Sequence, residues 1–487
     1  DPAITCPSSR ARKPTRHSPS SATSASRPAN TAPMLSFFDD TIRAIPRLRA
    51  VIVPSHAGAP EVRCDLMWLD ASAAFHACAS SEAGVYVTDY ASCLALCGII
   101  KYQRIGSMSL VQRVAGFLAN LAGRMDETDV IKTALGASRG DLLSLLDLAI
   151  PVVRTLINED GGHVSRMPDR HMVLLRQLVE LRSAAAFAGV GIEERLDEII
   201  RKMGSVGRMW RHGDGKMANF NGAGMINAAH VEEVLNRTGT SAKILQQAPQ
   251  SGFLRFASGR TTLIIDTGAP APRDASADFT LGFGTLSFEM SIGNTPLVVN
   301  AGQTAAEPNL RHLLCSTSAH STISIDDQNS SDPESGRVAK ISNVEVGPAT
   351  GGILATASHD GYESSHGILH HRKLYLAAGG GNLRGSDELE YTGAPGEIPR
   401  HAILRFHLHN RVSAAMLGNG QVLMKIRGNK TGWLFKAAGG EVGLDNSVYF
   451  DAGIRHSCQQ IVIRAPLSEI RTLGRHELKW AFRRSDS

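Results

Sequence analysis

One short segment of the chain groups histidine and arginine side chains that could perform acid–base chemistry on an anionic substrate. In residues 160–171, an Asp-Gly-Gly turn is followed by His163, Arg166, Arg170 and His171. An imidazole can exchange protons near neutral pH, and a planar guanidinium pairs with a carboxylate. The segment predicts proton transfer by His163 and His171, with Arg166 or Arg170 holding the carboxylate. A solvated loop between two helices is the alternative that these residues leave open.

A second segment, residues 211–222, combines His212 and Asn219 with several glycines at an expected domain junction. Binding sites often form where domains meet, and glycine allows the backbone to approach a ligand closely. We therefore expect His212 to be a catalytic residue and Asn219 to contact substrate. Alternatively, the glycines only end a helix and turn the chain toward the next domain.

Histidines of the second half of the chain are weaker candidates. His320 precedes an alternating segment and is expected to line a substrate groove, although such a residue is more often hydrogen-bonded within the core. His407 and His409 share one strand face, a spacing that suits a metal but more often serves structure. The Asp360-Gly361 pair predicts a tight hairpin. No nucleophile elbow, phosphate loop or cysteine-pair zinc motif occurs, which argues against hydrolase, kinase and zinc-finger classes.

The periodicity of apolar residues predicts two kinds of domain. Helical spacing occurs over residues 110–121, 141–150, 169–187 and 193–210, as expected for antiparallel helical hairpins. After about residue 213, short apolar runs alternate with turn residues, which predicts a large antiparallel sandwich. The expected strands are residues 261–265, 286–290, 297–299, 322–325, 371–376, 403–408, 421–426 and 460–463. The fold class is therefore multidomain, α plus β.

The composition of the chain limits which partners and which cellular compartment are expected. Hydrophobic residues are 43% and charged residues 20%, so most of the chain should fold in water. The net charge of +5 lies mostly in residues 1–33, which favours neither nucleic acid nor a membrane as partner. That segment is polar and is expected to be a disordered tail without a secretory signal. As written, the protein is expected to be cytoplasmic, and a periplasmic location stays open if the true N-terminus is missing. Seven cysteines give no disulfide framework.

Several ordered landmarks resemble those of the heparinase II/III family. They include Asp160-Gly-Gly-His163, Leu286-Ser-Phe-Glu289, Val299-Asn-Ala-Gly302, Ser318-Ala-His320 and Phe406-His-Leu-His409, and the resemblance covers roughly residues 105–487. It implies an α/α toroid and a β-sandwich with a carbohydrate groove between them. It also implies β-elimination on uronic-acid polysaccharides such as glycosaminoglycans, in which a tyrosine and a histidine share the proton work, and a structural zinc in the sandwich.

The chain departs from this family pattern at two places. Where the resemblance leads us to expect a Pro-x-Tyr-His run, the chain has Pro168-Asp-Arg-His171, and Arg170 cannot act as a base near neutral pH. The expected zinc-binding His-x-His-x-Asp run aligns with residues 280–284, which hold no histidine, and the zinc aspartate aligns with Asn300. We therefore predict no zinc and no other cofactor.

These observations lead to one prediction of domains and function. Residues 1–33 form the tail, residues 34–212 a partial α/α-toroid-like domain, and residues 213–487 the heparinase II/III-like sandwich. The predicted function is cleavage of a heparin- or heparan-type, or other acidic, polysaccharide by β-elimination. The alternative is a non-catalytic carbohydrate-binding or structural member of the same family. The oligomeric state is not predicted.

Overall fold

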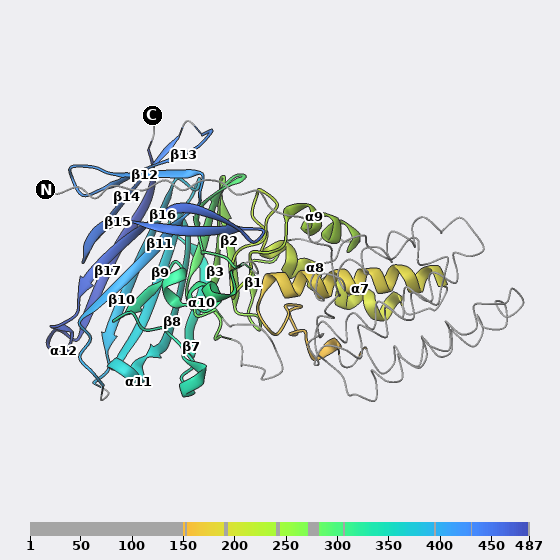
Figure 1. Ribbon diagram of the computed structural model, residues 1–487, viewed down its shortest axis with the longest axis horizontal. Helices are drawn as coiled ribbons and strands as arrows, with labels where there is room; N and C mark the ends of the chain where they lie inside the picture. Colours follow the sequence, from red (N-terminus) through yellow and green to blue (C-terminus); the bar gives the residue numbers. More distant parts are fainter. Residues whose placement is uncertain are drawn as a thin grey trace, which may run out of the picture.

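A computed structural model describes residues 150, 153–188, 193–239, 244–270, 282–304, 307–393, 396–429 and 431–485. In this part of the chain, three helices lead into a large β-sandwich (Figure 1). The expected tail, the helix over residues 110–121 and all but the last residue of the helix over residues 141–150 lie outside the described residues. The toroid therefore stays a prediction.

The three helices before the sandwich are α7 (Pro168–Ala188), α8 (Glu193–Met209) and α9 (Ala228–Arg237). The first two confirm the helices expected from apolar spacing. Helix α9 begins where the Asn227 side chain accepts a hydrogen bond from the backbone N–H of His230. The buried side chains that join these helices include Leu174, Leu175, Leu178, Ile200, Met203, Val231 and Leu235. In the described part of the chain, no helix has the length and apolar character needed to cross a membrane.

The first sheet of the sandwich has the strand order β1-β2-β3-β4-β5-β11-β16-β15, and β6 also pairs with β11. All of its pairs are antiparallel. Its strands are β1 (Gln247–Ala248), β2 (Phe253–Ser258), β3 (Thr261–Asp266), β4 (Phe288–Ile292), β5 (Thr295–Val299), β6 (Ile323–Ile325), β11 (His401–Leu408), β15 (Glu441–Asp451) and β16 (Ile454–Pro466).

The second sheet has the order β12-β13-β14-β17-β10-β9-β8-β7 and is also antiparallel. Its strands are β7 (Ile341–Ala349), β8 (Gly352–Tyr362), β9 (Ile368–Ala377), β10 (Asn382–Tyr391), β12 (Val412–Met416), β13 (Val422–Ile426), β14 (Gly432–Ala438) and β17 (Arg475–Ser485). Short helices α10 (Arg311–Cys315), α11 (Glu363–His366) and α12 (Ile470–Leu473) lie in the connections. All eight expected strands fall within or overlap these elements.

An aromatic cluster fills the space between the two sheets. Phe288 stacks on Trp480 with ring centroids 5.6 Å apart and an interplanar angle of 7°, and Phe406 meets the same indole edge-on at 4.7 Å. Gly385 on β10 makes room for this indole, because a Cβ there would lie 2.0 Å from Trp480 Cζ2. Each buried aromatic side chain contributes about 1.5–3 kcal/mol to folding. The sandwich therefore has its own core.

Two details differ from the sequence-based expectations. The sandwich was expected to start at residue 213, but α9 follows that position and the first strand begins at Gln247. The tight hairpin at Asp360-Gly361 is wrong, since both residues lie inside β8, beside a bulge. Asp360 accepts a hydrogen bond from the backbone of Lys340 at 2.7 Å, and the chain turns later, through α11 and Gly367 in the left-handed region. Pairing with β7 therefore overrides the local turn preference.

Candidate functional site

The Asp-Gly-Gly turn of residues 160–162 docks directly on the sandwich. Asp160 accepts hydrogen bonds from the backbone N–H of Ser251 at 2.7 Å and from its hydroxyl at 2.6 Å. A Cβ on Gly162 would lie 1.9 Å from the Ser251 hydroxyl oxygen, so only glycine permits this approach. Gly162 therefore fits a close contact with the sandwich, whereas Gly161 lies against Lys202 of α8.

Arg166 forms the centre of this contact. Its guanidinium pairs with Asp266 on β3 and donates to the carbonyl oxygens of Ser251 (2.9 Å) and Ala269 (2.5 Å). It also lies over the Phe253 ring, 5.0 Å from the centroid. Burial raises the pKa of Asp266, and the Arg166 charge opposes that shift. Only 6% of Arg166 is exposed, so its guanidinium interacts with groups of the protein itself.

The two histidines of the same segment are buried and neutral. His163 Nδ1 accepts from the backbone N–H of Ser165 at 3.0 Å, and burial lowers its pKa to about 3, with smaller effects from His171 and Arg170. His171 donates Nε2–H to the carbonyl of Met203 at 2.9 Å, and burial lowers its pKa to about 4. Its ring also meets Trp210 edge-on at 4.9 Å. His171 therefore joins α7 to α8.

Helix α7 is tied to the junction segment at its first turn. Asp169 accepts from the backbone N–H groups of Gly224 (3.1 Å) and Met225 (2.7 Å). Burial raises the Asp169 pKa to about 6. Arg170, which follows it, is partly exposed. Among the sequence-predicted residues of this segment, Arg170 is thus the one that solvent reaches most readily.

The junction residues His212 and Asn219 meet at Glu289 on β4. His212 donates Nε2–H to Glu289 Oε2 at 3.0 Å, and its Nδ1 lies 2.9 Å from the Ser291 hydroxyl oxygen. Glu289 Oε1 accepts from the backbone N–H groups of Asn219 (3.0 Å) and Asn300 (2.9 Å). All of these side chains are buried. The Glu289 carboxylate therefore binds both the junction segment and the residue that follows β5 to the first sheet.

The residues at the zinc landmarks do not fit a zinc ion. His320 donates Nδ1–H to the carbonyl of Ser316 at 2.7 Å, and burial lowers its pKa to about 4. Gly284 lies against its ring, where a Cβ would be 2.4 Å from Cδ2. Asn300 accepts from the backbone of Ser321 and offers an amide in place of a carboxylate. In the described ranges, no three histidine, cysteine or acidic side chains gather where they could hold a metal ion.

The histidines of β11 also have structural partners. His407 contacts the Ser447 hydroxyl through Nδ1 at 2.7 Å and donates Nε2–H to the carbonyl of Ser318 at 2.9 Å. Burial lowers its pKa to about 3. His409 packs on Tyr449 with ring centroids 4.8 Å apart. These contacts favour the structural interpretation of the pair over metal binding.

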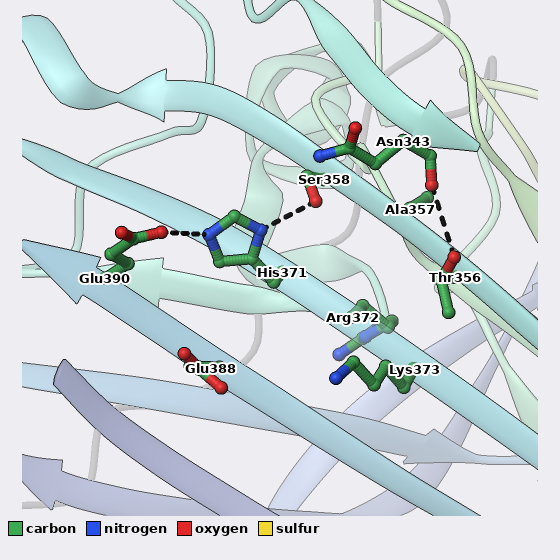
Figure 2. Close-up of a pocket in the computed structure, with 9 residues that line it drawn as sticks. All are labelled: Asn343, Thr356, Ala357, Ser358, His371, Arg372, Lys373, Glu388 and Glu390. Atoms are coloured by element: carbon green, nitrogen blue, oxygen red, sulfur yellow. Dashed lines mark hydrogen bonds and ion pairs between the residues drawn. The ribbon is translucent and has the colours of Figure 1, made fainter. Parts of the chain in front are cut away.

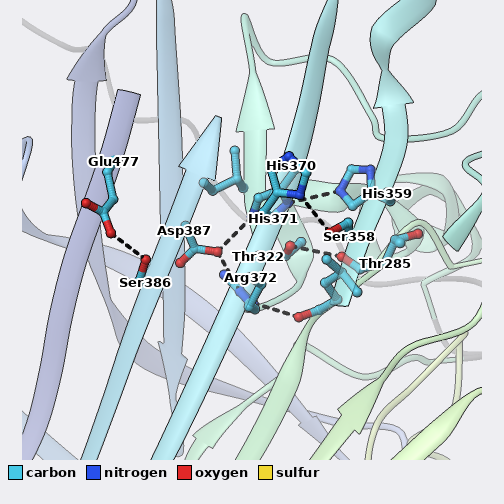
Figure 3. A network of polar contacts seen from close by, with 12 residues as sticks. Thr285, Thr322, Ser358, His359, His370, His371, Arg372, Ser386, Asp387 and Glu477 are labelled. Carbon is cyan, nitrogen blue, oxygen red and sulfur yellow. Dashed lines mark hydrogen bonds and ion pairs between the residues drawn. The ribbon is translucent and has the colours of Figure 1, made fainter. Parts of the chain in front are cut away.

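A buried polar network that the sequence did not reveal crosses the second sheet (Figure 3). Asp387 accepts from His370 (2.7 Å), Arg372 (2.6 Å) and the Trp480 indole (2.7 Å). Arg372 also donates to the carbonyls of Leu286 and of Ser321, close to the first sheet. Burial opposes ionisation of Asp387, yet Arg372 and His370 hold its pKa below the ordinary value. The sequence signal was that two inward positions of β9, His370 and Arg372, are polar although the other inward positions of that strand are Ile or Leu.

An open recess of about 310 Å³ lies on the outer face of the same sheet (Figure 2). Its centre is His371, whose Nδ1 contacts the Ser358 hydroxyl at 2.7 Å and whose Nε2 contacts Glu390 at 2.9 Å. The complete lining is Asn343, Thr356, Ala357, Ser358, His371, Arg372, Lys373, Glu388 and Glu390. None of these residues was a sequence-based candidate. Polar residues at alternate positions of a strand occur on the solvated face of any sheet, so the pattern did not indicate a site.

Apart from the partly exposed Arg170, the structure thus divides the sequence-based candidates into separate buried groups. His163, His171 and Arg166 lie in the contact around Ser251 and α8, and His212 and Asn219 share Glu289. His320 has its own partner at Ser316. In the part of the chain that the structure describes, these hydrogen bonds do not connect a histidine of one group with a histidine of another group. Their catalytic and substrate-binding roles stay predictions.

The sandwich matches a known family of domains. Residues 240–480 match the family model described as Heparinase II/III-like, C-terminal, which confirms the resemblance seen in the sequence. The crystal structure of heparan sulfate lyase HepC from Pedobacter heparinus aligns with a TM-score of 0.59 and 12% identity, covering 95% of this chain and 85% of that chain. A crystal structure of heparinase III aligns with a TM-score of 0.58 and 13% identity, covering 93% and 73%. At such identities the likeness concerns the fold alone.

A curated relative is more similar in sequence. FtsZ-localized protein C from Caulobacter vibrioides is 27% identical over 412 residues, which cover 80% of this chain and 67% of that protein. The chain is therefore similar both to lyases in fold and to a protein named for its localisation with FtsZ.

Proposed function

We propose that this chain is a non-catalytic heparinase II/III-like protein that binds an acidic polysaccharide without cleaving it. The observation that carries the proposal is the burial of two imidazoles and one guanidinium that the sequence singled out in residues 160–171. His163 Nδ1, His171 Nε2 and the Arg166 guanidinium are all hydrogen-bonded to groups in the protein interior. β-Elimination needs a base and an acid that reach the substrate, together with neutralisation of the sugar carboxylate.

Arg170 gives the proposal further support. It stands where the resemblance leads us to expect the tyrosine that shares proton transfer, and a guanidinium cannot act as a base near neutral pH. His163 is held neutral beside it, with a pKa near 3, and its Nδ1 already accepts a hydrogen bond. A positive side chain at this position suits attraction of an anionic sugar better than removal of its proton.

Two measurements on the same polymers test the proposal. The full chain is incubated with a panel of uronic-acid polymers, and the absorbance of the unsaturated product is followed while binding is measured by calorimetry. We expect binding to at least one polymer and no product. Product that disappears in His163→Ala would establish the lyase instead, and neither binding nor product with any polymer would reject both functions.

A second candidate function is association with FtsZ, and the observation that favours it is the 27% identity with FtsZ-localized protein C over 80% of this chain. Co-sedimentation of the purified chain with FtsZ polymers tests it. We expect the chain in the pellet only when GTP and FtsZ are both present. Equal amounts in the pellet without FtsZ would exclude this association.

A further inference from the structure

The outer face of the second sheet carries a group of exposed cations on four adjacent strands. Along β9, β10, β17 and β14, the inward positions are filled by buried residues such as Leu374, Leu383 and Phe482, so the alternating positions point outward. The outward cations include Lys373, Arg384, Lys436, Lys479 and Arg483, and all five are exposed. This basic face is therefore produced by the strand period itself.

The strand register arranges four of these cations in two parallel rows. Lys373 lies opposite Ser386, which lies opposite Lys479. In the next row, Arg384 lies opposite Ala481, which lies opposite Lys436. Neighbouring strands are about 4.8 Å apart, so the two cations of each row are roughly 10 Å apart with a small residue between them. The rows thus present separated positive charges on a flat surface.

The recess around His371 adjoins the first row. Ser358, His371 and Glu390 form a hydrogen-bonded chain along one wall, and Lys373 lies at the edge (Figure 2). The recess offers hydroxyl, imidazole, amide and carboxylate groups, which can exchange hydrogen bonds with sugar hydroxyls. Tyr375, two residues after Lys373 on β9, has the Arg384 guanidinium 5.6 Å from its ring centroid. A polyhydroxylated ligand can form hydrogen bonds with the polar groups of the recess and pack against the Tyr375 ring.

Acidic side chains interspersed in this face restrict the ligand. Glu388 and Glu390 line the recess, and Glu477 contacts Lys479 at 2.8 Å. Duplex DNA carries one negative charge per about 1.7 Å of axis, and such a density would place phosphates against these carboxylates. A polymer whose anionic groups alternate with neutral sugars can place its charges on the cations and its hydroxyls in the recess.

We propose that this outer face, from the recess at His371 to Lys436, binds acidic polysaccharide. Sugar hydroxyls occupy the recess, and carboxylate or sulfate groups lie on Lys373, Arg384 and Lys479. This inference rests on the proposed function. It places the polysaccharide-binding site away from the landmark residues. The face belongs to the sheet that does not touch the contact at Arg166, so binding requires no rearrangement there.

The test compares two double variants of the full chain that remove the same charge. Lys373→Gln/Arg384→Gln changes the basic face, and Arg455→Gln/Arg464→Gln changes exposed cations on β16 of the other sheet. Calorimetry with heparin and with polygalacturonate measures affinity, and neutral dextran serves as the ligand control. We expect an affinity loss of about tenfold or more in the first variant and less than about twofold in the second, with salt weakening the wild-type affinity.

A recess variant separates sugar contacts from charge. Ser358→Ala/Asn343→Ala keeps every charge, and we expect weaker binding with an unchanged salt dependence. Equal affinity of wild type and Lys373→Gln/Arg384→Gln would overturn this site while leaving polysaccharide binding in place. Absence of binding in the wild type would instead reject the proposed function, and this inference with it. Tighter binding to duplex DNA or to anionic vesicles than to heparin would also overturn the site.

Discussion

The contact around Arg166 and the outer face around Lys373 use similar side chains in opposite ways. At Arg166, a guanidinium, a carboxylate and an imidazole are buried and satisfied by protein atoms. At Lys373, ammonium, guanidinium and carboxylate groups remain exposed on a regular sheet. The comparison teaches that the same residue types can serve as buried contacts in one region and remain available to solvent in another, depending on their tertiary surroundings.

The largest expected effect comes from breaking the buried contact. Arg166→Ala leaves Asp266 without its cation, and we expect the free energy of unfolding to fall by about 3–5 kcal/mol. Chemical denaturation measures the loss. Arg464→Ala, which breaks an exposed pair with Asp445, is the control and should cost less than about 1 kcal/mol. Similar losses in both variants would contradict the structural role of Arg166.

The core beneath the outer face should respond to a single methyl group. Gly385→Ala places a Cβ 2.0 Å from Trp480 Cζ2, and we expect a loss of about 1–3 kcal/mol from the forced repacking. Gly347→Ala on β7 meets nothing within 4 Å and is the matched strand control. Thermal denaturation of both variants gives the difference, and an unchanged melting temperature in Gly385→Ala would refute the predicted clash.

Acid should weaken the buried region through its neutral histidines. The pKa of His171 is near 4 in the folded state and about 6.5 in the unfolded chain, so its stabilising contribution is complete above pH 6.5 and is lost as the pH falls toward 4. One such group changes stability by about 1.4 kcal/mol per pH unit in that window. We expect the pH slope to decrease by that amount in His171→Gln, measured by urea unfolding.

Asp169 contributes in the opposite direction over part of the same range. Its pKa is near 6 in the folded state against 3.8 in the unfolded chain, so its protonation favours the folded state as the pH falls below 6. His163, with a folded pKa near 3, adds to the loss caused by His171. A net gain of stability between pH 6.5 and 5 would contradict this balance.

The smallest expected effect concerns the outer face. Lys373→Gln/Arg384→Gln should change the free energy of unfolding by less than about 0.5 kcal/mol, because both side chains are exposed. Thermal denaturation checks this value. A loss above about 1 kcal/mol would show that these cations hold the sheet together and that a weaker affinity reflects unfolding.

Local sequence determined much of the fold. Apolar spacing located α7 and α8, and short alternating runs located strands such as β3 and β11, because the helical and strand periods are properties of the chain itself. The ordered landmarks also predicted the heparinase II/III-like domain that the comparison confirms. The Asp360-Gly361 hairpin failed because pairing between β7 and β8 outweighs a two-residue preference.

Only the tertiary structure decided what the polar residues do. The sequence singled out His163, Arg166 and His212 as candidate site residues, but their burial and partners such as Ser251 and Glu289 depend on segments far away in the chain. The same holds for Lys373 and Arg384, which became one surface through the register of β9 with β10. Residue type and spacing fix which chemistry is available, whereas exposure and partners, set by long-range packing, fix whether it can be used.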